Sequence, residues 1–290
     1  MRKVEGFCDV CVLTYALMDN HFHILVEVPE SETEISDEEL YRRMGFLYDK
    51  RAIMEVEAEI EKWCEQGRDD IAERIRKRYL VRMHDVSEFM KTLKQRFTQH
   101  YNAANGMNGV LWNDRFKSVL VENSEHALTT MAAYIDLNPV RAGLTKDPEE
   151  YRYCGYADAV AGGACAKTGL MSLVQAFGRI EEWPEASALY RKHLYCAGEE
   201  KGLSAEEVEH VLEENGELSL DQILRCRVRY FSDGVALGSK EFVNSVFDRY
   251  REKFGLKRKT GARAMKHGKW GELCSMRDLR KEPVAPPSPD

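Results

Sequence analysis

The sequence predicts an α+β domain over residues 1–158, then a helical, basic domain over 159–272 and a disordered tail over 273–290. Three observations support this: two β-branched apolar runs near the N-terminus, later segments with apolar residues at helical spacing, and basic residues concentrated towards the C-terminus. An apolar share of 43% fits a globular protein with a core. No apolar run approaches the roughly 20 residues of a membrane span, and the N-terminus lacks a secretory pattern. We therefore expect a cytoplasmic protein with no membrane partner.

The first predicted element is a β-hairpin. Residues 10–17 and 22–28 are apolar runs rich in β-branched side chains, and Asp19 and Asn20 lie between them at the turn. Pro29 ends the second strand.

A helical insertion is predicted after the hairpin, over residues 36–85, where apolar residues recur at helical spacing among charged ones. The next predicted helix covers residues 86–101. Its apolar face consists of Phe89, Leu93, Phe97 and Tyr101 at steps of four residues.

The rest of the first domain is predicted to hold two short strands and a helix. The strands are expected at residues 110–112 and 116–121, and the helix at residues 124–138, with Ser124 as its N-cap. Pro139 ends this helix. The core stripe of the helix consists of Leu128, Met131 and Ile135.

The second domain combines helical patterning with positive charge. The chain has a formal net charge of −7, yet residues 225–269 contain thirteen basic side chains and only four acidic ones. Two helices are predicted around a turn at Asp233 and Gly234, and a further turn at Gly238 precedes a basic helix with Ser239 as N-cap. This pattern is typical of a helix-turn-helix element that contacts DNA; a purely structural role is the alternative.

Two histidines stand one residue apart at the second predicted strand. Because side chains two positions apart in a strand face the same way, His21 and His23 are expected side by side. This geometry suits two imidazole ligands of one metal ion. The alternative is one core histidine and one exposed histidine.

A tyrosine and an asparagine lie four residues apart on the helix at 124–138. Tyr134 and Asn138 therefore share one face, which we expect beside the core stripe and not inside it. A phenol can act as a covalent nucleophile, and an amide oxygen can complete the coordination of a hard metal ion. The alternative is that Tyr134 packs at the core edge while Asn138 caps the helix C-terminus.

Three stretches occur in the order MDNHFHILVEV, LKQRFTQHYNAANGMNGVLWNDRFKSVLVE and YIDLNPVRAGL. Together they resemble the single-tyrosine HUH transposases, of the IS200-like kind, and in particular the REP-associated tyrosine transposases. The resemblance covers roughly residues 8–157. The HUH motif (His, hydrophobic, His) corresponds to His21, Phe22 and His23, and the N-P-V tripeptide that follows the family's nucleophilic tyrosine selects Tyr134.

The resemblance implies a ferredoxin-like antiparallel sheet with helices on one face. It also implies metal-dependent cleavage and rejoining of single-stranded DNA at repeats that fold into hairpins. A divalent ion, Mg²⁺ or Mn²⁺, would be held by His21 and His23 with Asn138 as third ligand, and would polarise the scissile phosphate. Tyr134 would attack the phosphorus to give a 5′-phosphotyrosine and a free 3′-hydroxyl. No nucleotide cofactor is implied.

Other residues are expected to hold the single-stranded or hairpin DNA, through phosphate contacts and base stacking. The candidates for DNA binding are Trp112, Arg115, Lys117, Arg141, Arg258 and Lys259. The alternative is that the charges are ordinary surface groups and that Trp112 belongs to the core.

The sequence departs from the family in two places. Members generally have a strand, a helix and another strand ahead of the HUH strand, whereas this sequence begins almost at the hairpin. From this we expect an N-terminally truncated domain with weakened stability and activity. Asp19 stands where the family usually has proline, and its carboxylate is expected to face solvent.

The function expected from these observations is that of a DNA strand transferase, a transposase. One rival is a DNA-binding relic that keeps hairpin affinity and has lost catalysis. A second is a metal-dependent hydrolase that uses the histidines to activate water. A homodimer is left open.

Overall fold

The computed structural model of this chain shows an α+β protein and describes residues 1–30, 35–175, 180–196, 231, 234–265 and 271–277. Its contacts divide the chain into unit 1, which is Met1–Val12 with Val26–Phe116, and unit 2, which is Leu13–Leu25 with Lys117–Asp290. The predicted α+β class is confirmed. The predicted domain limit at residue 158 stays a prediction.

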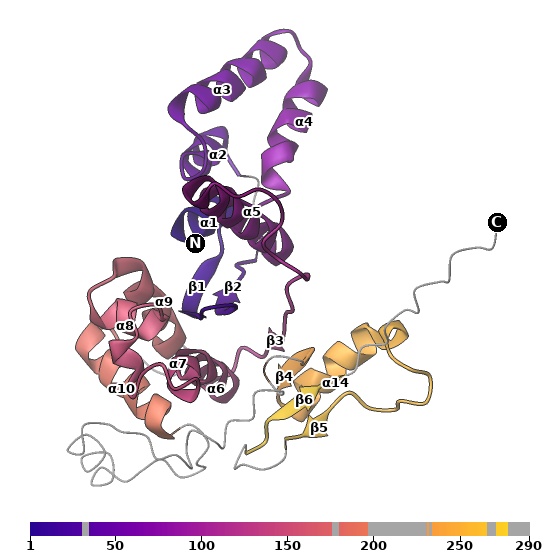
Figure 1. The fold of residues 1–290 in the computed structure, drawn as a ribbon. Helices are drawn as coiled ribbons and strands as arrows, with labels where there is room; N and C mark the ends of the chain where they lie inside the picture. Colours follow the sequence, from indigo (N-terminus) through magenta and orange to yellow (C-terminus); the bar gives the residue numbers. More distant parts are fainter. Residues whose placement is uncertain (31–34, 176–179, 197–230, 232–233, 266–270, 278–290) are drawn as a thin grey trace, which may run out of the picture. The chain divides into compact units, whose positions relative to one another are not determined.

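Unit 1 consists mainly of helices. These are α1 (Arg2–Cys8), α2 (Asp37–Met44), α3 (Lys50–Glu65), α4 (Asp69–Leu80) and α5 (Val86–Asn105), labelled in Figure 1. Ser36, Asp49 and Asp85 are the N-caps of α2, α3 and α5, and each side chain accepts a hydrogen bond from the backbone N–H three residues on. Helices α2 to α4 confirm the predicted helical insertion. No helix was predicted at α1, which packs against α5.

Helices α3 and α4 pack side by side on a small apolar cluster formed by Ile60, Ala72 and Ile75 (Figure 1). Helix α5 differs, because only its first half is covered. Phe89 is fully buried, whereas Phe97 and Tyr101 are 48% and 39% exposed. The apolar face predicted for this helix is therefore buried only near the N-terminal end of α5.

Unit 2 begins with the turn end of a two-stranded sheet formed by β1 (Cys11–Leu17) and β2 (Phe22–Glu27). This confirms the predicted hairpin. A bridge between Ala16 and Cys154, and a hydrogen bond from the Leu17 N–H to the Tyr153 carbonyl, attach β1 to a later loop of the same unit. The hairpin turn is thereby held against the body of unit 2.

Unit 2 contains several helices within its described residues, and one of them, α6 (Glu125–Asp136), is deeply buried. The others are α7 (Asn138–Arg141), α8 (Gly155–Val160), α9 (Ala164–Gln175), α10 (Trp183–Cys196) and α14 (Lys240–Arg249), with a 3₁₀ turn at Pro148–Glu150. Ser124 precedes α6 as predicted, but its side chain makes no cap hydrogen bond. The helix predicted to run to Asn138 ends two residues earlier, at Asp136, and Pro139 lies in the first turn of α7. Proline is tolerated there because the first N–H groups of a helix need no partner within it.

A four-stranded sheet is the second sheet of the chain and also belongs to unit 2. Its strands are β3 (Leu120–Val121), β4 (Ala236–Gly238), β5 (Arg263–Ala264) and β6 (Cys274–Met276), in the order β3-β4-β6-β5. β3 pairs with β4 in parallel, and the other two pairings are antiparallel. Helix α14 packs on β4 and β6.

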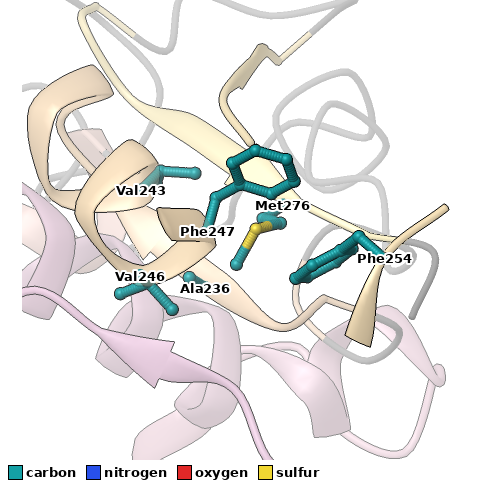
Figure 2. Packing of buried hydrophobic residues seen from close by; sticks show 6 residues of the cluster. All are labelled: Ala236, Val243, Val246, Phe247, Phe254 and Met276. Atoms are coloured by element: carbon teal, nitrogen blue, oxygen red, sulfur yellow. The ribbon is translucent and has the colours of Figure 1, made fainter. Parts of the chain in front are cut away.

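The core between α14 and this sheet is apolar (Figure 2). It is formed by Ala236, Val243, Val246, Phe247, Phe254 and Met276. Ser239 caps α14 as predicted, since its Oγ accepts from the Phe242 N–H. Glu122, which follows β3, accepts from both the backbone N–H and the Oγ of Ser239, each at 2.7 Å. A carboxylate at a helix N-terminus is stabilised by the helix dipole.

The sheet corrects three predictions for the C-terminal part. The second domain is not purely helical, and Gly238 ends a strand instead of forming a turn. A Cβ at Gly238 would meet the Glu122 Cβ at 2.5 Å, so glycine is needed there for close packing. Strand β6 falls within the tail predicted to be disordered from residue 273, so that prediction is wrong at its start.

Other predictions are confirmed only in part. The strand predicted at 116–121 is reduced to Leu120–Val121, and residues 110–112 form no strand. The first helix of the predicted helix-turn-helix element lies before Phe231, outside the described residues. Within the described ranges, no helix is long and apolar enough to cross a bilayer.

Candidate metal and tyrosine site

The turn of the β1–β2 hairpin places the two histidines. The Met18 N–H donates to the His21 carbonyl, which closes the turn, and His23 lies in β2. The imidazole centroids are 5.1 Å apart and the ring planes are nearly perpendicular, at 87°. The predicted side-by-side arrangement of His21 and His23 is thus what the structure has. Asp19 in the same turn is exposed, as predicted.

The neighbour of His21 determines which ring nitrogen is available. The His21 Nδ1 lies 2.7 Å from the Asn20 Oδ1, in the exposed turn. Because an amide oxygen only accepts, Nδ1 carries the proton and donates. Nε2 of His21 is then the nitrogen with a lone pair. A hydrogen bond donated by the other ring nitrogen is typical of histidines that bind a metal ion.

His23 is held in its neutral form. Burial lowers its pKa to about 4, and electrostatic interactions with His21 and Arg141 lower it as well. Within the described part of the chain, the His23 imidazole makes ring contacts and no hydrogen bond. A neutral imidazole is the form that binds a metal ion.

Tyr134 of α6 lies directly against His23. Their ring centroids are 5.5 Å apart, and the Arg141 guanidinium carbon lies 4.4 Å from the Tyr134 ring centroid. Phe231 stacks on the same ring at 4.5 Å. The structure therefore brings together His21, His23, Tyr134 and Arg141, which were predicted from separate stretches of sequence.

Tyr134 is more deeply buried than predicted. It is 2% exposed, and nearly every residue of α6 is buried, so Tyr134 does not stand beside a narrow core stripe. A helix that is apolar all round is a central helix of a core. The alternative of a packing role for Tyr134 therefore has structural support of its own.

Asn138 lies one turn beyond Tyr134 and is 8% exposed. Its Nδ2 donates to the carbonyls of Tyr134 and, at longer range, Ile135. The amide nitrogen thus caps the end of α6, which is the structural alternative considered for this residue. The Oδ1 is the end of the amide that these carbonyls do not use, and it is the atom suited to a metal ion.

These residues could hold a hard divalent ion only if water or substrate supplied the remaining ligands. His21 and His23 supply two neutral imidazoles, and Asn138 supplies one amide oxygen. Among the described residues, no three His, Cys, Asp or Glu side chains gather in a way that could hold a metal. Mg²⁺ commonly keeps several waters and binds through few protein groups plus phosphate oxygens, so the donor set fits such an ion when a phosphate is present.

Asp136 is the central polar residue of unit 2, and sequence reasoning missed it. It is fully buried on α6, two residues after Tyr134. Its carboxylate accepts hydrogen bonds from the Thr14 Oγ1 at 2.9 and 2.8 Å, from the Tyr156 N–H at 3.2 Å, and from the Tyr190 hydroxyl. Burial raises its pKa to about 6, and the hydrogen bonds oppose that rise. The available signal was a single carboxylate inside the apolar stretch MAAYIDL.

The Asp136 hydrogen bonds join α6 to β1, α8 and α10. Thr14 lies on the same hairpin that carries the two histidines, while Tyr156 and Tyr190 lie on α8 and α10. Because a buried polar group is costly unless it is paired, this network fixes the position of α6 in the unit. Asp136 is therefore a positioning residue for the helix that bears Tyr134.

The remaining predicted DNA-binding residues are divided between the two units. Trp112 and Arg115 belong to unit 1, and Lys117 opens the second segment of unit 2. The Trp112 Nε1 donates to the Lys94 carbonyl at 3.2 Å and to the Thr98 Oγ1 at 3.0 Å, so its polar edge is used on α5. Arg115 and Lys117 are exposed.

Arg258 and Lys259 follow α14 and differ from each other. The Arg258 guanidinium donates to the carbonyls of Thr260, Gly261 and Arg277. It also lies over the rings of Phe247 and Phe254. This arginine is a structural element of the α14 core, whereas Lys259 is exposed and remains a candidate for phosphate contact.

No protein-family model matches this chain, and no curated protein or solved structure matches it either.

Proposed function

We propose that the protein cleaves and rejoins single-stranded DNA at hairpin-forming repeats, as a metal-dependent tyrosine transposase of the REP-associated, HUH type. The observation that supports this most directly is the contact of the His23 ring with both His21 and Tyr134. Two imidazoles and a phenol, drawn from stretches more than a hundred residues apart, meet at one place. A packing role alone would not require two imidazoles side by side at a hairpin turn.

In this proposal His21 and His23 hold a divalent ion, Mg²⁺ or Mn²⁺, and Asn138 offers its Oδ1 as a third ligand. Such an ion supplies positive charge that polarises the scissile phosphate. His21 binds through Nε2, because its Nδ1 is used on Asn20. His23 needs no deprotonation at neutral pH, since its pKa is about 4.

Tyr134 is the proposed nucleophile. Its Oη loses a proton and bonds to the phosphorus, while the bond from phosphorus to the 3′ oxygen breaks and that oxygen takes up a proton. A 3′-hydroxyl attacking the phosphotyrosine reverses these steps and restores the phenol. A free phenol has a pKa of about 10, so loss of the proton needs help from the metal ion or a nearby base. The guanidinium of Arg141 lies 4.4 Å from the ring centroid of Tyr134.

The burial of Tyr134 adds a condition to this mechanism. At 2% exposure its phenol must become accessible before a phosphate can reach it. We expect this to happen when DNA binds. The hairpin and α6 would form part of the ferredoxin-like sheet and helix layer typical of the family, and the protein would act in the cytoplasm.

The test is formation of a covalent adduct. The protein is mixed with a labelled DNA hairpin carrying single-stranded flanks, with Mn²⁺, and run on a denaturing gel. A labelled band that persists in the native protein and is lost in Tyr134→Phe supports the proposal. A band of equal intensity in Tyr134→Phe contradicts it.

A DNA-binding relic is the second candidate, and the structure offers two observations in its favour. Tyr134 is buried, and the Asn138 Nδ2 is engaged in capping α6. Hairpin binding in a native gel with no adduct in Mg²⁺ or Mn²⁺ would establish this candidate in place of the first.

A further inference from the structure

We propose that Phe97, Tyr101 and Trp112 form an aromatic platform on unit 1 that stacks the unpaired bases of a single DNA strand. The identity of the ligand as DNA rests on the proposed function, whereas the location of the platform does not depend on Tyr134 or the histidines. Of the three rings, only Trp112 was predicted to contact DNA. Phe97 and Tyr101 were predicted only to share the apolar face of the helix at residues 86–101.

The three rings lie in a row. The centroids of Phe97 and Tyr101 are 5.9 Å apart, with planes 28° from parallel, and the Trp112 centroid is 5.7 Å from that of Phe97. Phe97 and Tyr101 stand four residues apart on α5, so their rings are neighbours on one helix face. Base–aromatic stacking is tolerant of sequence because every base presents a π face.

Polar contacts hold the row in place. The Trp112 Nε1 donates to the Lys94 carbonyl and to the Thr98 Oγ1, which fixes the indole on α5. The loop before it is attached by the Asn102 Nδ2, which donates to the Gly109 carbonyl at 2.9 Å. The rings are thus positioned before any ligand arrives, which lowers the entropic cost of binding.

The exposure of this row is not explained by the fold of unit 1. Helix α5 already buries its first half through Phe89, which is fully covered, while Phe97 and Tyr101 remain 48% and 39% exposed. Met107 and Val110 in the adjoining loop are also largely exposed. Neighbouring exposed apolar side chains of this size usually mark an interaction site.

The charge around the rings favours a nucleic acid as the occupant. Residues 91–115 contain four basic side chains and one acidic one, in a chain whose formal net charge is −7, and of the four Lys91 is paired with Glu88 at 2.9 Å. Lys94 lies over the Trp112 ring at 5.2 Å, and Arg115 is exposed just after it. The single acid, Asp114, offers its backbone carbonyl to Lys94. Aromatic rings with cations beside them are the combination that binds single strands through bases and backbone together.

The experiment measures binding of a fluorescent oligothymidylate to the full chain by anisotropy. Every protein carries Tyr134→Phe, so that covalent chemistry does not contribute. We expect the double variant Phe97→Ala with Tyr101→Ala to bind roughly tenfold more weakly or worse, from the usual contribution of a stacked base. Phe97→Tyr with Tyr101→Phe retains both rings and should bind like the parent.

Two controls separate stacking from other causes. Met54→Ala trims an exposed apolar side chain on α3 of the same unit, outside the row of rings, and should leave affinity unchanged. An oligonucleotide of the same length with abasic positions keeps the phosphates and removes the bases. On that strand the alanine double variant and the parent should bind equally, because nothing remains to stack.

Several results would overturn the proposal. Unchanged thymidylate affinity in the double variant would do so, as would an equal loss of affinity on the abasic strand. A change in self-association without a change in DNA binding would assign the rings to a protein contact instead. Because both side chains are exposed, the thermal unfolding midpoint of the double variant should match that of the parent.

The outcome is separable from that of the proposed function. If native protein forms no adduct but the double variant loses thymidylate affinity, the platform stands and strand cleavage fails. If adducts form through Tyr134 while the double variant binds normally, cleavage stands and the platform fails.

Discussion

Asp136 and the pair His21 and His23 are two polar centres among the described residues of unit 2, and they are built in opposite ways. The Asp136 carboxylate is fully buried and accepts hydrogen bonds from three different elements. The imidazoles lie at a hairpin turn, His21 exposed and His23 half-buried, with Asn20 as the one hydrogen-bonding partner among the described residues. The carboxylate oxygens of Asp136 are engaged in hydrogen bonds within the fold. Of the ring nitrogens of the two histidines, only the His21 Nδ1 is so engaged among the described residues, which leaves the others available to a ligand.

This difference distinguishes Asp136, which stabilises the fold, from the two histidines that we propose bind a metal ion. Replacing Asp136 should affect folding stability first, since three donors would lose their acceptor. Replacing the histidines should barely affect stability but should remove metal binding. The predictions below test this contrast, from the largest expected effect to the smallest.

Asp136→Ala is expected to lower the free energy of unfolding by about 3 kcal/mol or more, because the Thr14 hydroxyl, the Tyr156 N–H and the Tyr190 hydroxyl are left buried without an acceptor. Chemical denaturation would measure it. The matched control is Asp248→Asn, an exposed carboxylate in the same unit, which should change stability by less than about 0.5 kcal/mol. Equal effects of the two variants would refute the central role of Asp136.

Tyr190→Phe removes one of the three donors and leaves the carboxylate bound to the other two. We expect a loss of about 1.5–3 kcal/mol, the usual range for a hydrogen bond to a charged group. The combination with Thr14→Val would show whether the network is cooperative. Strictly additive losses would mean that the two donors act independently.

Ser239→Ala tests a local element away from both polar centres. The Oγ of Ser239 caps α14 and also donates to Glu122. We expect a loss of about 1 kcal/mol, typical of an N-cap. Ser245→Ala replaces an exposed serine on the same helix and should lower the free energy of unfolding clearly less. The denaturation midpoints of the two variants provide the comparison.

The histidines give the smallest change in stability and the clearest change in ligand response. His21→Ala should alter the unfolding free energy of the metal-free protein by no more than about 0.5 kcal/mol. Saturating Mn²⁺ should raise the thermal midpoint of the native protein by about 2–4 °C. The variant should show no such rise. A rise of equal size in His21→Ala would place the metal elsewhere.

Local sequence patterns correctly predicted the elements that are stabilised by interactions between residues close in the sequence. The hairpin at β1 and β2 follows from β-branched runs around a short turn, and α14 begins where Ser239 predicts it. The four-stranded sheet was not predictable in this way, because its strands are two or three residues long and β3 pairs with a strand more than a hundred residues later. Periodicity also predicted an apolar face on α5 without indicating how much of it would be covered.

The candidate site shows the same limit. His21 and His23 could be placed side by side from strand geometry alone, and the resemblance selected Tyr134. The burial of Tyr134 could not be predicted, because it depends on Arg141 and Phe231 packing on its ring. Asp136 was missed for the same reason, since its partners come from distant positions in the sequence.

The most direct test of the central claim is to map a DNA adduct onto the chain. After incubation with hairpin DNA and Mn²⁺, nuclease and protease digestion would leave a nucleotide on the attacking residue, and mass spectrometry would identify it among the 13 tyrosines. The account predicts modification of Tyr134 alone, abolished when His21 and His23 are both replaced by alanine. Modification of another tyrosine, or of Tyr134 without any need for the histidines, would contradict it.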